Sequence, residues 1–323
     1  MRRMLDLQAS DLEKITGREL LASVRAAEGR ALMAETICTI PPLLGDVSNP
    51  EAVRAFGADL VLLNMFDVDA PRIEGLPSGG RLGYWTDRYN AAVVPAPQGS
   101  DPVREAKALI GRPVGINLEP LPEDPAVLGV RAVLPPGRTA TASSALKARD
   151  LGVDFLVLTG NPATGVTCGA ITTALRELRR ALGEDYPLMA GKMHAAGSAE
   201  ESGEGIVTPA VVDEWIDAGA DVVLLPAPGT VPGVDVPFVQ GLVRQIHRRG
   251  ALALTAVGTS QEGSDEGTIR ALALACKMAG ADLHHLGDSG YSGMALPENL
   301  MAYSVALRGR RHAYRRMATS PRR

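Results

Sequence analysis

The chain has 323 residues, of which 46% are hydrophobic, 22% charged and 4% aromatic, and its formal net charge is −4. This composition predicts a large core, as two domains or one α/β barrel, and gives no reason to expect a nucleic-acid partner. The three cysteines lie far apart without a CxxC or Cys/His pattern, which argues against a disulfide framework. No apolar signal core or membrane-length run occurs, so we expect a cytoplasmic protein without a membrane partner.

Strand and helix patterns alternate along residues 31–323, after a helical extension that is predicted over residues 1–30 and expected to cover the bottom of the following domain. A phrase with a Gly at the helix end, then an Asp and an apolar run, recurs in FGADLVLLN, LGVDFLVLTGN, AGADVVLLPAPG and AGADLHHLGD. Four further strands are predicted at 31–38, 113–120, 187–194 and 252–259, and helix-like segments follow all eight strands.

Eight such units in series predict one (β/α)8 TIM barrel, an α/β fold. The alternative is a doubly wound open sheet, which usually has fewer strands and an early Gly-rich phosphate loop. Neither GxGxxG nor GxxxxGKS/T occurs in the chain, so the barrel is the favoured interpretation.

Polar side chains collect at the C-terminal ends of seven of the eight predicted strands, where the active site of this fold lies. They are Glu35, Asn64, Asp67, Asn117, Glu119, Thr159, Asn161, Lys192, His194, Thr255, Thr259, His284, His285 and Asp288. The residues expected to bind substrate are Asn64, Asn117, Thr159 and Asn161. Glu35 and Glu119 are expected to move protons as catalytic carboxylates.

The stretch PLMAGKMHAAG, residues 187–197, starts as an apolar strand and ends with Lys192 and His194, which a strand would point to one side. A buried lysine with a lowered pKa would form a Schiff base with a carbonyl substrate, with His194 as general acid or base. The ammonium would otherwise hold a carboxylate, phosphate or enolate electrostatically. The third interpretation is a structural ion pair with Glu119 or Glu35.

Two adjacent histidines and an aspartate at the last strand allow a metal site as an alternative. His284 and His285 would face opposite sides of the strand, so only one of them reaches the barrel centre. With a carboxylate such as Glu35, His285 and Asp288 would hold a divalent ion, Mg²⁺ or Mn²⁺. Otherwise the inward histidine is a hydrogen-bonded core residue and no cofactor is required.

The loops after the last three predicted strands are rich in glycine, at 226–233, 258–268 and 287–294. Barrels often bind phosphate with the loops after strands seven and eight, through backbone N–H groups. The residues expected to do so are Gly258, Thr259, Gly290, Ser292 and Gly293. The simpler interpretation is that these residues only make turns. The segments 68–100 and 198–205 are expected to form lids.

Five blocks of the sequence carry a resemblance to a known family: LTGNPATGVT, AGKMHAAG, LLPAPGTVPG, AVGTSQEG and HHLGDSGYSG. Together they resemble a bacterial family of aldolase-type barrels whose members carry labels such as haloacid-dehalogenase-like hydrolase or phosphonomutase. The resemblance covers nearly the whole chain and implies the barrel fold. The first label does not suit this chain, because no DxDxT/V motif follows a first strand. The second label implies a magnesium-dependent barrel that acts on a phosphoenolpyruvate-like substrate. The acidic metal-binding motifs of that superfamily are not clearly present in this chain.

The leading hypothesis is a lyase or isomerase, aldolase-like, that acts on a small phosphorylated carbonyl compound such as a sugar phosphate. Lys192 would be its Schiff-base nucleophile or electrostatic catalyst. The alternatives are a metal-dependent C–C or P–C lyase or mutase of the phosphoenolpyruvate type and a non-catalytic phosphosugar-binding protein. A homo-oligomer is expected, and the basic C-terminal run RGRRHAYRR is attributed to the helix dipole and a subunit contact.

Overall fold

A computed structural model gives the structure of the chain and describes residues 2–77, 101–123, 127, 130–198 and 201–323. Its eight strands form a closed parallel barrel in chain order, with β8 paired to β1, which confirms the predicted (β/α)8 fold. The strands are β1 Ala31–Ile37, β2 Leu60–Asn64, β3 Val114–Leu118, β4 Phe155–Leu158, β5 Leu188–Gly191, β6 Val222–Pro226, β7 Leu252–Val257 and β8 Leu283–Leu286.

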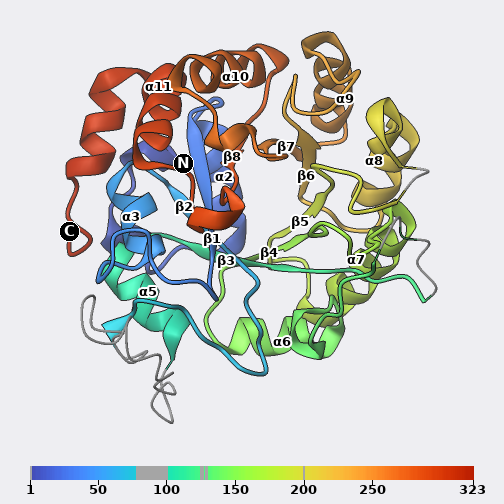
Figure 1. Ribbon diagram of the computed structural model, residues 1–323, viewed down its shortest axis with the longest axis horizontal. Coiled ribbons are helices and arrows are strands. Elements are labelled where there is room, and N and C mark those ends of the chain that lie inside the picture. Colours follow the sequence, from blue (N-terminus) through green and yellow to red (C-terminus); the bar gives the residue numbers. More distant parts are fainter. Residues whose placement is uncertain (1, 78–100, 124–126, 128–129, 199–200) are drawn as a thin grey trace.

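Helices follow the strands round the barrel in chain order (Figure 1). They are α3 Asn49–Ala55, α5 Pro102–Ile110, α6 Ala142–Asp150, α7 Cys168–Leu182, α8 Pro209–Asp217, α9 Val236–Arg248, α10 Glu266–Ala279 and α11 Pro297–Ala318. The sequence supplies start signals for them: the side chains of Asp101, Thr208 and Asp265 accept hydrogen bonds from the first turns of α5, α8 and α10. A proline follows the first two of these caps, at a position where a backbone N–H group would have no acceptor within the helix.

Alternate residues of each strand belong to two separate apolar layers. On β5, Met189 faces the barrel interior together with Met193 just beyond the strand, whereas Leu188 and Ala190 pack in the layer beneath the helices. The interior is full: a Cβ added at Gly115 of β3 would lie 2.1 Å from the ring of Phe155. The interior of the barrel is therefore a packed core.

The N-terminal segment packs against the N-terminal end of the barrel. It contains the short helices η1 Met4–Asp6 and α1 Ala9–Leu12 and the longer α2 Gly17–Ala26. Met4, Leu5 and Leu20 belong to the same apolar cluster as the inward residues of the strands. Figure 1 shows α2 and the N-terminus near the middle of the ring of helices. The opposite end of the barrel, at the strand C-termini, is left for the site.

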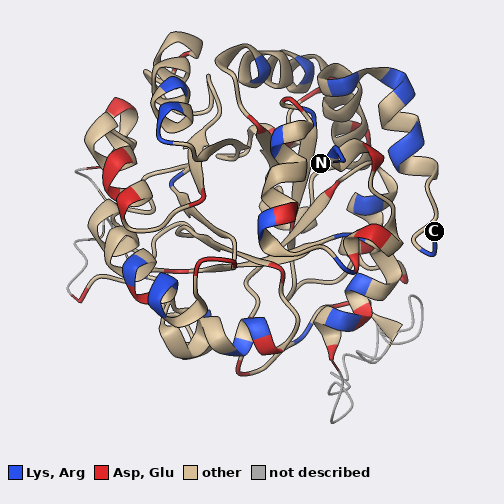
Figure 2. Cartoon of the chain, turned by 180° about the vertical axis from the view of Figure 1, so that it is seen from behind, with Lys and Arg blue, Asp and Glu red and all other residues tan. Residues whose placement is uncertain are grey.

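A buried group of charges lies beside this N-terminal end. Arg308 Nη1 is 2.5 Å from Asp59 Oδ2, and Arg316 Nε is 2.6 Å from Asp59 Oδ1, with all three side chains at most 2% exposed. Burial opposes the ionisation of Asp59, but the two guanidinium groups hold its pKa below the ordinary value. Both arginines come from the basic run of α11 (Figure 2), so part of that run is interior and not a surface patch.

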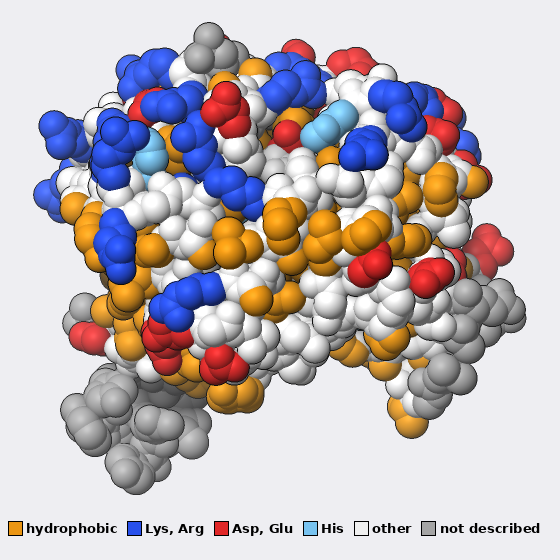
Figure 3. Space-filling view, turned by 90° about the horizontal axis from the view of Figure 1, so that it is seen from above, with side chains coloured by type: hydrophobic (Ala, Val, Ile, Leu, Met, Phe, Trp, Pro, Cys, Tyr) orange, Lys and Arg blue, Asp and Glu red, His pale blue; other side chains and the backbone are white. Residues whose placement is uncertain are grey.

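Figure 3 shows a face on which basic side chains occupy one half and hydrophobic side chains form a band across the middle. Large exposed hydrophobic side chains occur on α10, at Leu274 and Met278, and on α11, at Met301.

Within the part of the chain that the structure describes, every helix is too short or too polar to cross a bilayer.

Candidate active site

A cavity of about 470 Å³ opens at the C-terminal ends of the strands. It is lined by Glu35, Asn64, Asn117, Thr159, Gly160, Asn161, Pro162, Met193, His194, Ala195, Ala196, Gly197, Gly258, Thr259, Ser260, Glu262, Gly287, Asp288, Ser289 and Gly290. The residues come from the ends of strands far apart in the sequence, as the fold predicts. We call this cavity the mouth. Its volume is typical of a site for a small organic ligand.

Two asparagines form the centre of a hydrogen-bond network in the mouth. Asn64 and Asn161 each donate a side-chain hydrogen bond of 3.0 Å to the other. Asn64 also donates to Asp288 Oδ2 at 2.8 Å, and Asn161 donates to Glu119 Oε1 at 3.0 Å. Both predicted substrate-binding amides are therefore held in fixed orientations, which is what a preorganised site requires. Asn117 and Thr159, the other two predicted binders, also line the mouth.

Glu119 lies behind this network and does not line the mouth. It is 1% exposed and ion-paired with Arg138, and it accepts a hydrogen bond from the backbone N–H of Asn161 at 3.2 Å. A guanidinium and two amide donors therefore hold this carboxylate in one orientation. Its position supports an orienting role toward Asn161 more than the proton transfer expected from sequence.

Glu35 and His285 form a buried acid–base pair on neighbouring strands. His285 Nε2 lies 3.3 Å from Glu35 Oε2, with side-chain exposures of 0% and 6%. Burial raises the pKa of Glu35 above its ordinary value, and the nearby Asp288 and Glu262 add to this, although His285 opposes it. Neither ring nitrogen of His285 makes a hydrogen bond to another described residue. A carboxyl with a raised pKa at a ligand cavity is suited to proton transfer near neutral pH.

His284, next to this pair, faces the other way. Its Nδ1 lies 3.1 Å from the hydroxyl of Tyr303, and its Nε2 lies 3.2 Å from the carbonyl oxygen of Gly29. The expectation that the two histidines divide between the barrel centre and the helix layer is confirmed, and His285 is the inward one.

His194 lies at the mouth as a neutral imidazole. Its Nδ1 accepts a hydrogen bond of 3.0 Å from the backbone N–H of Ala196, so the proton of the neutral ring is on Nε2. Burial, and then the charge of Lys192, lowers the pKa of His194 to about 4. A neutral imidazole at pH 7 is a hydrogen-bond donor for a substrate oxygen and not a source of positive charge.

Lys192 does not line the mouth, contrary to the expectation that it lies there beside His194. Its Nζ contacts the carbonyl oxygens of Val166 at 2.9 Å and Ala195 at 3.3 Å, and Glu201 Oε2 at 2.6 Å. These contacts use all three donors of the ammonium group. The reason is strand alternation: Lys192 continues the face of Leu188 and Ala190, which points away from the barrel interior. The ion-pair interpretation fits this geometry, with Glu201 as partner in place of Glu119 or Glu35.

Replacing Lys192 by methionine should lower the free energy of unfolding by about 2–3 kcal/mol, because Glu201 loses its partner but keeps some contact with water. Urea denaturation followed by circular dichroism measures this loss, and exposed Lys14→Met is the matched control, with little change expected. Adding Glu201→Gln to Lys192→Met should recover part of the loss. Borohydride treatment of the wild type with carbonyl compounds should leave Lys192 unmodified, and a reduced adduct at that residue would contradict the structural assignment.

The residues predicted to bind metal lie near one another but have other partners. Asp288 accepts hydrogen bonds from Asn64 and, at 2.8 Å, from the backbone N–H of Gly290, while His285 faces Glu35. Among the described residues, no three His, Cys, Asp or Glu side chains form a group that could hold a metal ion. The donors present therefore do not fit the predicted Mg²⁺ or Mn²⁺ site, and no reaction step is assigned to a metal.

The residues predicted to bind phosphate divide into two groups. Gly258, Thr259 and Gly290 line the mouth, with φ of 57° at Thr259 and 58° at Gly290. Ser292 and Gly293 do not: the Ser292 hydroxyl donates to the carbonyl of Met294 at 2.7 Å, and Gly293 is packed against other side chains. No lysine or arginine is among the described lining residues. Within the described lining, the mouth therefore offers a phosphoryl group no cation.

The two predicted lids differ in how much of them can be described. Residues 78–100 of the first lie outside the described residues. In the second, Glu201 accepts hydrogen bonds of 3.0 and 3.1 Å from the backbone N–H of Cys168, in addition to its pair with Lys192. This part of the segment is therefore tied to the start of α7.

Sequence reasoning missed Glu262, Ser289 and Ser260, which also line the mouth. Glu262 is 6% exposed, and burial followed by the charge of Asp288 raises its pKa. Glu262 Oε2, Ser289 Oγ and Thr159 Oγ1 are buried and have no hydrogen-bond partner among the described residues. The available signal was a glutamate inside a Gly- and Ser-rich loop directly after a strand. Unpaired buried polar atoms around one cavity support a polar ligand there.

The family model described as "Domain of unknown function (DUF7916)" matches residues 5–323. No curated protein matches the sequence. Among solved structures, a Schiff-base-forming fructose-1,6-bisphosphate aldolase has 15% identity and a TM-score of 0.52, covering 90% of this chain and 97% of its own. An archaeal fructose-1,6-bisphosphate aldolase with its catalytic Lys covalently bound to the carbinolamine intermediate has 15% identity and a TM-score of 0.52, covering 91% and 99%. At this identity the similarity shows the barrel fold alone.

Proposed function

The chain belongs to the family described as Domain of unknown function (DUF7916), and from the chemistry of its barrel mouth we propose an enzyme of the lyase or isomerase kind. Its substrate would be a small carbonyl compound carrying hydroxyl groups, and its reaction would begin with proton removal next to the carbonyl or from a hydroxyl. The observation that carries this proposal is the buried Glu35, which lines a cavity of about 470 Å³ and is paired with His285.

Glu35 would act as the base. With its pKa raised by burial, the carboxylate holds an abstracted proton more readily than an exposed glutamate does. The proton would move from carbon to a Glu35 oxygen, and the electron pair would form an enediolate on the substrate. Return of the proton to the neighbouring carbon, together with transfer of the hydroxyl proton from one substrate oxygen to the other, completes an isomerisation. In the lyase variant, Glu35 takes a hydroxyl proton, the adjacent C–C bond breaks, and the resulting enolate is protonated.

His194 would stabilise the charge that develops on the substrate oxygen. Its neutral ring carries the donor proton on Nε2, and a preorganised donor at a partly dry site favours an enolate over the neutral carbonyl. Asn117 and the unpaired hydroxyl of Thr159 are available to bind the substrate's hydroxyl groups. Asn64 and Asn161 would keep the wall in place through their mutual hydrogen bonds.

This proposal departs from the sequence hypothesis in two respects. Lys192 would be a positioning residue that fixes the end of β5 and the segment around Glu201, because its three donors are already used. A phosphoryl group on the substrate is not required, because the described lining of the mouth contains no lysine or arginine. The structural similarity to Schiff-base aldolases supports the fold and the lyase kind of the proposal, not its lysine chemistry.

Proton exchange tests the proposal before the substrate is known. The protein would be incubated in D₂O with dihydroxyacetone, glyceraldehyde, pyruvate and dihydroxyacetone phosphate, and deuterium incorporation next to the carbonyl would be followed by NMR. We expect exchange above the buffer rate with at least one compound, and its loss in Glu35→Gln. Glu184→Gln, on the exposed turn after α7, is the control and should exchange normally. Equal exchange by all three proteins would contradict the role of Glu35.

A further inference from the structure

Glu262 is a second buried carboxyl group at the mouth, in addition to Glu35. It lies after β7, in the short helix η5 Gln261–Gly263, whereas Glu35 belongs to β1. In the closed barrel β8 lies between β7 and β1, so the two glutamates flank the end of β8. Both line the mouth, and their exposed fractions are 6% for Glu262 and 5% for Glu35. A ligand in the mouth therefore meets two carboxyl groups from different elements.

The glycine that follows β8 shows where the carboxyl group of Glu262 lies. A Cβ added at Gly287 would be 3.4 Å from the carboxyl carbon of Glu262. The side chain of Glu262 thus reaches the residue that precedes Asp288. The charges of Asp288 and His285 act on Glu262 as they do on Glu35, and the charge of Glu262 adds to the raised pKa of Glu35. These four groups therefore form one electrostatic cluster in the mouth.

The loop that carries Glu262 is held in place by a different side chain. Asn299 of α11 is 1% exposed, and its amide donates hydrogen bonds to the carbonyl oxygens of Glu262 at 2.9 Å and of Ser264 at 2.8 Å. The side-chain Oε2 of Glu262 accepts no hydrogen bond from a described residue. Asn299 therefore fixes this loop without use of the Glu262 carboxyl group.

The surroundings of Glu262 favour its protonated form. Burial raises the pKa of Glu262 above its ordinary value of 4.5, and the charge of Asp288 adds to this, although backbone N–H groups and His285 oppose it. A buried oxygen without a donor, such as Oε2, costs more free energy when the carboxyl group is ionised. The described lining of the mouth supplies no lysine or arginine to hold the ionised form. Glu262 is therefore suited to give a proton and to take it back.

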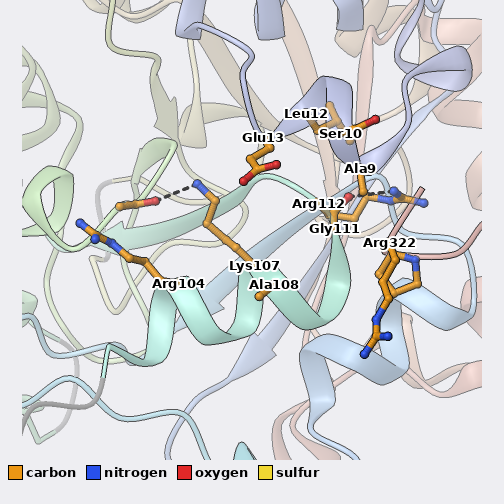
Figure 4. A pocket seen from close by; sticks show the side chains of 12 residues that line it. Ala9, Ser10, Leu12, Glu13, Arg104, Lys107, Ala108, Gly111, Arg112 and Arg322 are labelled. Atoms are coloured by element: carbon orange, nitrogen blue, oxygen red, sulfur yellow. Dashed lines mark hydrogen bonds between the residues drawn. The ribbon is translucent and has the colours of Figure 1, made fainter.

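The cavity at the other end of the barrel has the opposite charge (Figure 4). It has a volume of about 510 Å³ and lies beside α1 and α5. Its described lining includes the cations Arg104, Lys107, Arg112 and Arg322 and a single acidic residue, Glu13. Carboxyl groups without a neighbouring cation thus distinguish the mouth from this cavity. Glu13 is exposed and provides a matched control for Glu262.

We propose that Glu262 is a further catalytic residue, which carries a proton between the two oxygens of the substrate while Glu35 carries the other proton between its carbons. This inference rests on the function proposed above, in which isomerisation moves a hydroxyl proton from one oxygen to the other. A carboxyl group at the mouth supplies a carrier for that proton, which a direct transfer within the substrate lacks.

The two glutamates exchange roles during the reaction, and the protons balance. In the first step Glu35 takes the proton next to the carbonyl, and Glu262 gives its own proton to the enediolate oxygen, so a neutral enediol forms and Glu262 becomes ionised. In the second step Glu262 takes the proton of the other hydroxyl group, and the O–H electron pair forms the new carbonyl. The electron pair of the C=C bond then binds the proton that Glu35 returns to the neighbouring carbon. Both glutamates regain their starting charges.

The interconversion of dihydroxyacetone and glyceraldehyde tests this role in the whole protein. Two rates would be measured by NMR in D₂O: deuterium incorporation next to the carbonyl, and conversion of one compound into the other. Exchange requires Glu35, whereas conversion also requires the oxygen-to-oxygen transfer. Glu262→Gln keeps the size of the side chain but cannot carry the proton. We expect it to lower conversion about 10²-fold or more relative to exchange, the usual contribution of a positioned acid or base.

Two further variants make the outcomes distinguishable. Glu35→Gln should lose exchange and conversion together, and Glu13→Gln, at the other end of the barrel, should retain both. Equal loss of both rates in Glu262→Gln, or no loss of either, would overturn the role of Glu262 and leave that of Glu35 intact. A wild type that exchanges without conversion would overturn it as well. A wild type without exchange would instead contradict the proposed function, and this inference with it.

A measurement without substrate checks the same residue independently. The infrared absorption of protonated carboxyl groups would be compared between the wild type and Glu262→Gln as the pH is raised, and the difference reports where Glu262 loses its proton. We expect the midpoint of this loss to lie above the ordinary value of 4.5. A midpoint at or below 4.5 would show that Glu262 has no proton to give, and would overturn the proposal whatever the substrate is.

Discussion

Replacing Glu35 by glutamine is expected to lower the rate of carbonyl-adjacent proton exchange by about 10²–10⁴-fold, the usual contribution of a positioned general base. Glutamine keeps the size of the side chain but cannot accept the proton. The stability of the variant should equal or exceed that of the wild type, because the substitution removes a buried carboxyl that is close to Asp288 and Glu262. Loss of activity together with unchanged or higher stability separates a catalytic role from a structural one.

The pH dependence follows from the raised pKa of Glu35. As a base it works when ionised, so exchange should decline as pH falls through its raised pKa. For stability, the folded state binds this proton more tightly than the unfolded state does. The contribution is therefore present below the ordinary value of 4.5 and is lost as pH rises through the folded pKa. In Glu35→Gln that decline should disappear. A wild-type and variant pair with the same pH–stability curve would contradict the assignment.

Replacing Asp59 by asparagine is expected to cost about 3–5 kcal/mol of unfolding free energy, the largest stability effect that the structure predicts. Asp59 is the shared partner of Arg308 and Arg316, and its Oδ2 also accepts the backbone N–H of Leu32 at 2.9 Å. Removing the charge leaves two buried guanidinium groups without a counter-ion. Urea denaturation measures the loss, and a chain that does not fold at 37 °C would be the extreme form of the same result.

Asp6 provides the matched control, because it also pairs with two arginines but at the surface. Its side chain is 28% exposed and contacts Arg3 and Arg315 at 2.7 and 2.9 Å. Asp6→Asn should cost about 0–1 kcal/mol, the usual value for exposed pairs. The lowered pKa of Asp59 means that its contribution is present above the ordinary value of 3.8 and is lost as pH falls through the folded pKa. Similar losses for the two variants would show that burial does not decide the energetics here.

The fold was predictable because several of the βα units have local signals. The Gly–x–Asp phrase and the caps at Asp101, Thr208 and Asp265 depend on neighbouring residues only. The rule that strand C-termini meet at one end also placed Glu35, Asn64 and His194 at the mouth correctly.

The direction of Lys192 was not predictable in the same way. In a barrel covered by helices, both faces of a strand are buried, so alternation of polar and apolar residues does not mark the inside. Met189 and Ala190 are both apolar, yet Met189 faces the barrel interior and Ala190 faces the helix layer. The prediction that Lys192 and His194 point to one side was wrong. Lys192 keeps the outward direction of Leu188 and Ala190, whereas His194, three residues beyond the end of β5, lines the mouth.

Ion pairs between residues that are far apart in the sequence could not be predicted from local sequence patterns either. Arg308 is 249 residues from Asp59, and their pair joins the last helix to the residue before β2. The basic run of α11 therefore resembled a solvated helix end in the sequence.

Several residues at the rim of the mouth have left-handed backbone conformations although they are not glycine. They are Thr259, Ser260 and Ser289, with φ of 57°, 76° and 56°. Such residues cost about 1–2 kcal/mol each relative to ordinary backbone. The same loops hold buried polar atoms that no described residue satisfies. We therefore expect native-state opening to need less free energy at this rim than at the end of the barrel around Asp59. The molecule can rearrange locally where a ligand enters without loosening the barrel that holds it.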